Sequence, residues 1–346
     1  MKRFFYILLS LVALSGCKFG FEVENDADPG VYLSCIASPD SISYYLRYAS
    51  PLGVNAGDIP DVKVLESSIS VSGRPLGRNP LIVEDDIKVY PVGGMLGSGD
   101  EVRIRVRTEN LGDLDARTAI PQRISLDSVA LVRTDMMGII MDDFTIRLDR
   151  QPEEGEYVGL FMSRTVSPDE MNWDWGWMEE PLDSLEVSDI KYLSPATTVA
   201  TNADVELCQV DFCWPRYIRT WSMGYGQDQP FTVIPAAAFR NNEVSLMVTS
   251  FSAIYGGYPG SEEEAEAEPF DPMYTFTVMS VSEEFYRYSL AVHRSRTDFL
   301  ALMGLAPAQF AWSNVDGGFG LCGAISHPST IELPLSELLV LKGQTP

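Results

Sequence analysis

The sequence has few of the residues that catalytic and metal sites most often use. Only two histidines, His293 and His327, occur in 346 residues, which removes most histidine-based zinc sites and leaves few ways to build a nucleophile–base pair. The signatures GxSxG, HExxH and GxxxxGK[ST] are absent. We therefore predict no catalytic residue, no metal site and no cofactor. A glycan or peptide hydrolase stays an alternative, because paired catalytic carboxylates are remote in sequence and the chain has 49 acidic residues.

Basic residues are also scarce. Lys and Arg total 25 against 49 Asp and Glu, which gives a formal net charge of -24. Binding to nucleic acid is not expected, because no net positive field is present to replace the counterions of the phosphates. The 45% hydrophobic and 21% charged content is typical of a folded protein and excludes disorder of the whole chain.

Long apolar runs are absent except at the N-terminus, and that one is too short to span a bilayer. Lys2 and Arg3 precede the apolar segment Phe4–Ala13, which is followed by Leu14-Ser-Gly-Cys17. This order predicts a lipoprotein signal peptide over residues 1–16, cleaved before Cys17, whose thiol then carries a diacylglycerol. Several acyl chains hold a protein permanently at a membrane surface. We predict a lipid-anchored protein at a membrane surface, with residues 17–29 as acylated cysteine and acidic tether.

Beyond the tether, apolar residues recur with a period of two. Val102, Ile104 and Val106 alternate with Arg103, Arg105 and Arg107, which predicts a half-buried strand whose outer face carries the three arginines. Similar segments rich in Val, Ile, Tyr and Thr follow one another with Gly and Pro turns between them. The predicted fold class is mainly β and mostly antiparallel.

The spacing of these strands predicts two β domains. Residues 30–121 contain strands at the spacing of an immunoglobulin-like sandwich. Residues 122–346 spread theirs over a longer stretch, which indicates a larger antiparallel sandwich or a partly closed barrel. One helix is predicted near residues 282–298. Ser282 is placed to cap it, Glu283 and Glu284 follow, and Phe285 lies on its apolar face.

Four cysteines remain once Cys17 carries lipid. An exported protein can form disulfides, and four cysteines allow three pairings. The short segment from Cys208 to Cys213 favours a local disulfide between these two residues. Cys35 and Cys322 are then either paired with each other or free. The alternative is that some or all four are buried thiols.

Three tryptophans, Trp173, Trp175 and Trp177, lie within five residues. In an extended loop their side chains share a face, which would form an apolar patch for a protein partner or a stacking platform for a glycan. We predict them as ligand or partner contacts. The alternative is a loop that folds over the β core.

The chain resembles a family of Bacteroidetes lipoproteins, domain of unknown function 4249. The resemblance covers the mature chain and rests on the lipobox with its acidic tether and on several segments that occur in the order of that family. These segments are Ala116–Pro121 leading into Ile124–Ser128, Phe212-Cys-Trp214, Ser282-Glu-Glu-Phe-Tyr-Arg-Tyr288 and Asn314-Val-Asp-Gly-Gly-Phe-Gly320.

The resemblance implies an accessory lipoprotein of the outer membrane, associated with a TonB-dependent receptor that imports large nutrients. It carries over no catalytic residues. We therefore expect a non-enzymatic, surface-exposed lipoprotein that helps such a receptor to capture a ligand, either a glycan or a peptide. An adhesin or an envelope-assembly lipoprotein is the alternative binding function.

Overall fold

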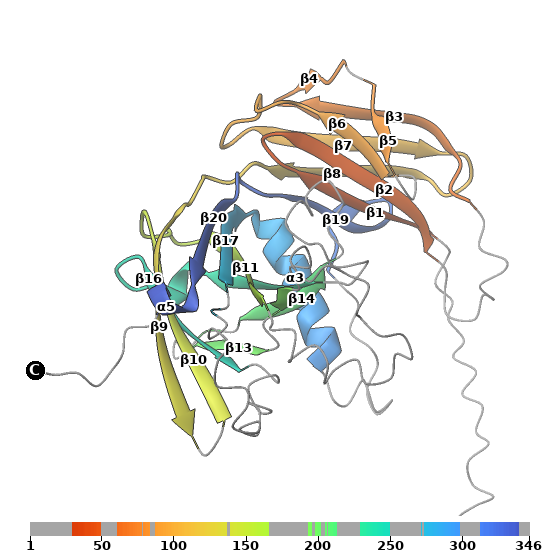
Figure 1. Cartoon of the computed structure of the whole chain (residues 1–346). Coiled ribbons are helices and arrows are strands. Elements are labelled where there is room, and N and C mark those ends of the chain that lie inside the picture. The colour runs from red at the N-terminus through yellow and green to blue at the C-terminus, as the bar shows by residue number, and fades with distance from the viewer. Residues whose placement is uncertain are drawn as a thin grey trace, which may run out of the picture.

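The computed structural model describes residues 30–49, 61–165, 193–212, 229–249, 271–297 and 312–338, apart from short gaps at 78, 84–86, 137–138, 196–197, 202–204, 206 and 272. The chain is mainly β, as predicted, and its strands form four sheets that pack in pairs (Figure 1). No helix in these segments is long and apolar enough to cross a membrane.

Two five-stranded sheets form the first sandwich. One has the order β19-β1-β2-β6-β5 and the other the order β18-β8-β7-β3-β4. The strands of the first sheet are β19 (Phe319–Ala324), β1 (Gly30–Ala37), β2 (Ser41–Ala49), β6 (Ile87–Pro91) and β5 (Leu81–Val83). Those of the second are β18 (Val315–Asp316), β8 (Asp113–Ala119), β7 (Glu101–Thr108), β3 (Val64–Val71) and β4 (Arg74–Pro75).

The strand order confirms the immunoglobulin-like prediction. If β1 to β8 are taken as strands A, B, C, C′, D, E, F and G, the sheets have the orders A-B-E-D and G-F-C-C′ of that fold. The alternation seen in the sequence explains the packing: Val102, Ile104 and Val106 of β7 are almost completely buried between the sheets. Leu33 on β1 belongs to the same core.

The first sandwich is completed by residues from the far end of the chain. β19 pairs in parallel with β1, and β18 pairs antiparallel with β8. Gly317 and Gly318 join these two strands, so the segment crosses from one sheet to the other along one edge of the sandwich. The predicted first domain is one continuous segment that ends at residue 121. In the structure, the first sandwich also contains Val315–Ala324.

The second sandwich combines the sheets β13-β16-β10-β9 and β14-β15-β11-β17-β20, with β12 paired to β11. The first of these contains β13 (Thr198–Thr201), β16 (Glu243–Thr249), β10 (Ile139–Leu148) and β9 (Leu126–Met136). The second contains β14 (Cys208–Phe212), β15 (Gln229–Pro235), β11 (Tyr157–Thr165), β17 (Met273–Val281), β20 (Ser329–Pro334) and β12 (Leu193–Pro195). The short helices η4 (Ala236–Ala238) and α5 (Leu335–Leu338) follow β15 and β20.

The described strands of this second unit form two open, packed sheets, so of the two predicted alternatives the sandwich is the correct one. Its core contains apolar residues from both sheets. Phe144 on β10 packs edge-on against Phe276 on β17, with ring centroids 5.3 Å apart, and Leu131, Leu246 and Val158 are buried beside them.

Helix α3 (Glu283–Thr297) joins the two sandwiches and confirms the predicted helix. It lies against β19 of the first sandwich and β14 of the second (Figure 1). Phe285 is completely buried in a third core that also contains Leu321 of β19 and Phe231 of β15. The hydroxyl groups of Tyr288 on α3 and Tyr32 on β1 are hydrogen-bonded at 2.8 Å. The two sandwiches therefore share a continuous apolar layer.

Candidate functional site

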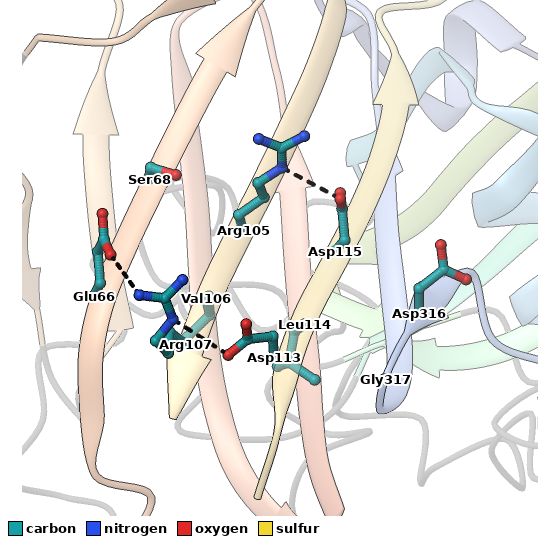
Figure 2. Close-up of a pocket in the computed structure, with 10 residues that line it drawn as sticks. All are labelled: Glu66, Ser68, Arg105, Val106, Arg107, Asp113, Leu114, Asp115, Asp316 and Gly317. Carbon is teal, nitrogen blue, oxygen red and sulfur yellow. Dashed lines mark hydrogen bonds and ion pairs between the residues drawn. The ribbon is translucent and has the colours of Figure 1, made fainter. Parts of the chain in front are cut away.

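A pocket of about 440 Å³ lies on the outer face of the sheet β18-β8-β7-β3-β4 (Figure 2). Most of the residues that line it are charged. The complete lining is Glu66, Ser68, Arg105, Val106, Arg107, Asp113, Leu114, Asp115, Asp316 and Gly317.

Strand register places these charges opposite one another. Arg105 on β7 is paired with Ser68 on β3 and with Asp115 on β8, and Asp115 is paired in turn with Asp316 on β18. Arg107, two residues further along β7, also faces outward. It is paired with Glu66 on β3 and with Asp113 on β8. The period-two pattern that buries the apolar residues therefore also gathers the charged residues on one surface.

The arginines of β7 each contact at least one carboxylate. Arg103 Nε donates to Asp115 Oδ1 at 2.7 Å, and Arg105 Nε donates to the other carboxylate oxygen at 3.2 Å. Arg107 lies 3.5 Å from Glu66 and 3.6 Å from Asp113 (Figure 2). The basic stripe seen in the sequence is thus the outward face of a strand, as interpreted, and its charge is offset by acids on the neighbouring strands.

The hydrogen bond from Arg103 holds the pKa of Asp115 below its ordinary value, and Arg105 lowers it further. The same hydrogen bond raises the pKa of Arg103. Both groups therefore stay charged throughout the neutral range. Because these side chains are partly exposed, each pair contributes only modestly to stability.

The lining carries more negative than positive charge. Glu66, Asp113, Asp115 and Asp316 face two arginines, Arg105 and Arg107. Within the part of the chain that the structure describes, no ion pair engages Asp316. This arrangement suits a ligand that presents hydrogen-bond donors or a positive charge to the carboxylates.

The sequence predicted none of the lining residues as ligand contacts, and Asp316 and Gly317 are the two that local patterns could not have placed on this surface. They are about 200 to 250 positions from the other lining residues, and only the pairing of β18 with β8 brings them together. The signal in the sequence was the Asp-Gly-Gly turn after Val315, which marks a reversal of the chain but does not identify its neighbour.

Most of the sequence-predicted site residues lie outside the described segments. This applies to Cys17, to Cys213 and to Trp173, Trp175 and Trp177. Cys208 is the first residue of β14 and is completely buried. The Cys208–Cys213 disulfide and the tryptophan contacts therefore stay predictions.

The structure does bring Cys35 and Cys322 together. They are register partners on β1 and β19, and both are buried free thiols. The described residues contain no group of three His, Cys, Asp or Glu side chains that could hold a metal ion.

Fold and pocket together define a mainly β protein of two sandwiches with a charged recess on the outer face of its immunoglobulin-like unit. The chain belongs to the family Domain of unknown function (DUF4249), whose model matches residues 18–331. No curated protein matches the sequence.

Two solved structures have low similarity to the chain. One is a crystal structure described as a membrane-anchored protein from Corynebacterium diphtheriae, with 10% identity and a TM-score of 0.19 over 73% of this chain. The match spans 55% of that protein's length. The other is the B domain of a biofilm-associated protein, with 8% identity and a TM-score of 0.19 over 88% of this chain and 86% of that one.

Proposed function

We propose that this protein is a non-enzymatic lipoprotein of the outer membrane that binds a ligand on behalf of a TonB-dependent receptor. The observation that carries the binding function is the pocket on the β18-β8-β7-β3-β4 face, to which β18 contributes from the distant end of the chain. The predicted lipobox ending at Cys17 and the chain's resemblance to Bacteroidetes lipoproteins support attachment to the outer membrane. The face of the membrane that we propose for the protein is the one toward the cell exterior.

The chemistry of the pocket favours a polar ligand. Arg105 and Arg107 are already engaged by carboxylates of neighbouring strands, so an anion would have to displace an existing partner. The carboxylate of Asp316, which no ion pair engages within the described residues, can accept a hydrogen bond from a donor group of the ligand. A peptide with a basic side chain, or a glycan that presents hydroxyl groups, fits this lining.

The shared apolar layer supports a role in which the body acts as one unit. Burial of Phe285 in a core that contains residues of both sandwiches holds the pocket-bearing sandwich and the second sandwich together as one body. This body can then be presented as a unit, on the tether predicted over residues 17–29, to a receptor in the same membrane.

The receptor can be sought by gently solubilising outer membranes and purifying the anchored protein. A TonB-dependent receptor in stoichiometric amount is the expected result. If the protein purifies without such a receptor, the accessory function is overturned and the adhesin or hydrolase alternatives gain weight.

The pocket is tested separately by charge reversal. Asp316→Lys should weaken ligand binding at least tenfold, because it places a cation where the ligand's donor would lie. Glu243→Lys is the matched control: Glu243 lies in an exposed ion pair with Arg147 on the second sandwich, and the two substitutions change the net charge equally. Equal loss of binding in both variants would show that the pocket is not the site.

A further inference from the structure

The most informative group outside the pocket is the pair of buried cysteines in the first sandwich. Cys35 on β1 and Cys322 on β19 are paired in the parallel register of these strands. Both side chains have no exposed surface and belong to the same core between the sheets. They therefore point to the same side of their sheet as nearest neighbours.

This placement meets the first geometric requirement for a disulfide. Adjacent strands lie about 4.8 Å apart, and bridged cysteines have Cα atoms about 4.4–6.8 Å apart. The side chain of Asn314 fixes the position of Cys322, since its Nδ2 donates to the Cys322 carbonyl oxygen at 2.8 Å and its Oδ1 accepts from the Cys322 N–H at 2.8 Å.

We propose that Cys35 and Cys322 form a disulfide that ties the first strand of the folded body to the segment from the far end of the chain. The thiolate of one cysteine attacks a reactive disulfide oxidant, forming a mixed disulfide and releasing one thiol of the oxidant. The second thiolate then attacks the protein sulfur and releases the other. Two protons and two electrons leave the cysteines, the S–S bond forms, and the oxidant becomes two thiols.

The bond forms while the protein folds, before the core closes. In the folded state the interaction with the neighbouring Cys35 thiol and complete burial raise the pKa of the Cys322 thiol, so the nucleophilic thiolate of Cys322 is scarce there. During docking of β19 on β1 the same thiols are still accessible to an oxidant.

The consequence concerns the strand that follows the tether. β1 begins at Gly30, directly after the predicted tether of residues 17–29, so a pull on the anchor acts first on β1. This part of the inference depends on the proposed lipid anchor. A bond at Cys35 would stop β1 from separating from the body, because β19 is also held by α3 and, through Gly317, by β18.

The test is a peptide map of the full chain after export, with thiols trapped by acid and then alkylated with N-ethylmaleimide under denaturing conditions. Trypsin places the four cysteines in three peptides: residues 19–47 contain Cys35, residues 297–342 contain Cys322, and residues 192–216 contain both Cys208 and Cys213. The expected product is peptide 19–47 joined to peptide 297–342 by a disulfide. Treatment with a reductant should separate the two peptides.

The linked peptides are distinct from a Cys208–Cys213 bond, which would lie within peptide 192–216 and leave the other two unlinked. Alkylation of both Cys35 and Cys322 in the exported chain would overturn the proposal. So would linkage of either residue to another cysteine. This map needs no variant, so it decides the question even where a substitution prevents folding.

Stability gives a second measurement. Closing a loop of nearly 300 residues should raise the midpoint of thermal unfolding by about 5–8 °C, and a reductant added before heating should remove that increase. The Cys35→Ala/Cys322→Ala variant should lose most of the change with reductant and keep only the smaller part that the short Cys208–Cys213 loop would give. The Cys208→Ala/Cys213→Ala variant, which also lacks two cysteines, should keep the larger part of the effect; if it loses that part instead, the bond does not lie between Cys35 and Cys322.

Discussion

Asp115 on β8 accepts hydrogen bonds from two arginines of the adjacent strand, Arg103 and Arg105. Arg103 contacts both carboxylate oxygens, in a two-pronged arrangement that suits the planar guanidinium group. Arg105, two residues further along β7 and on the same outer face, contacts the same carboxylate. Asp115 thus joins two rows of the charged outer face and holds Arg105 at the pocket.

Replacing Asp115 by Asn should lower stability at neutral pH by about 1 kcal/mol or less, because the ion pairs are partly exposed. Asp115 has a depressed pKa in the folded state, so its contribution is present above the ordinary value of 3.8 and is lost as the pH falls through the folded pKa. The difference between wild type and variant should therefore be largest at neutral pH and vanish in acid. Chemical unfolding measured from pH 7 down to pH 2 checks this expectation.

The control for this series is Glu243→Gln, which disrupts an exposed ion pair on the second sandwich. Its effect on stability should be smaller, because Arg147 contacts Glu243 at 3.4 Å from a more exposed position. An Asp115→Asn penalty that stayed constant down to pH 2 would contradict the assignment, since a protonated aspartate should make no ion pair.

Gly320 on β19 should not tolerate a side chain. Its φ is +118°, and a Cβ atom there would lie 2.0 Å from the backbone oxygen of Leu33 on β1. Gly320→Ala should cost about 3 kcal/mol or more, because both the backbone conformation and the β1–β19 contact would be strained. Denaturant unfolding followed by circular dichroism measures the loss.

Gly99 is the matched control for this substitution. It also has a positive φ, +85°, but no atom lies within 4 Å of the position of its Cβ. Gly99→Ala should cost only about 1–2 kcal/mol, from the conformation alone. Equal losses at both positions would mean that close approach to Leu33 contributes nothing.

Ser282 connects helix α3 to β19. Its Oγ accepts from the N–H of Phe285 at 3.3 Å and from the N–H of Ala324 at 3.1 Å. Ser282→Ala should destabilise the protein by about 2–3 kcal/mol, because a helix cap is lost and a buried backbone donor is left without its acceptor. Unfolding measurements should show at most about 0.5 kcal/mol for Ser295→Ala, whose Oγ only donates to Val292 within the helix.

The sequence predicted the local elements well, because their patterns depend on near neighbours. Val102, Ile104 and Val106 alternate with arginines, and this alternation determined both the strand and its buried face. Ser282 and the acids after it likewise predicted the start of the helix. The signals that end or cap an element lie within a few residues of it.

Long-range pairing was beyond such reasoning. Nothing near Val315 or Phe319 indicates that these residues join the first sandwich, because the parallel pairing of β19 with β1 depends on the whole fold. Cys35 and Cys322 were therefore left with two alternatives, and Asp316 was missed as a pocket residue. A charged outer face can be predicted from alternation, whereas the row that joins Asp115 to Asp316 cannot.

Cys17→Ala tests the predicted anchor. The substitution removes the thiol that would carry the diacylglycerol, so the chain should leave the membrane fraction or stay as an uncleaved precursor. Fractionation of outer membranes and detergent partitioning measure this directly. Unchanged attachment of the variant to the membrane would contradict lipidation at Cys17, and Cys208→Ala serves as a control that should stay attached.

The tryptophan segment gives a test that separates binding from folding. Asp174 and Gly176 alternate with Trp173, Trp175 and Trp177, so an extended segment would present three large rings on one face and little on the other. Replacing all three by Ala should weaken binding of the partner or glycan by about 2 kcal/mol or more, the size expected of aromatic contacts at the centre of an interface. The midpoint of thermal unfolding should stay within a few degrees of wild type.

The alternative, a loop that covers the core, makes the opposite prediction for the same triple variant. Lost apolar burial would then cost several kcal/mol of folding stability and leave binding intact. Titration calorimetry and thermal unfolding on one preparation measure both quantities. Trp221, a tryptophan distant in sequence from the segment, provides a control: Trp221→Ala tests whether loss of any large ring produces the same change. A large fall in the unfolding midpoint with binding retained would show that the three tryptophans serve the fold, because truncated contact residues cannot leave the affinity unchanged.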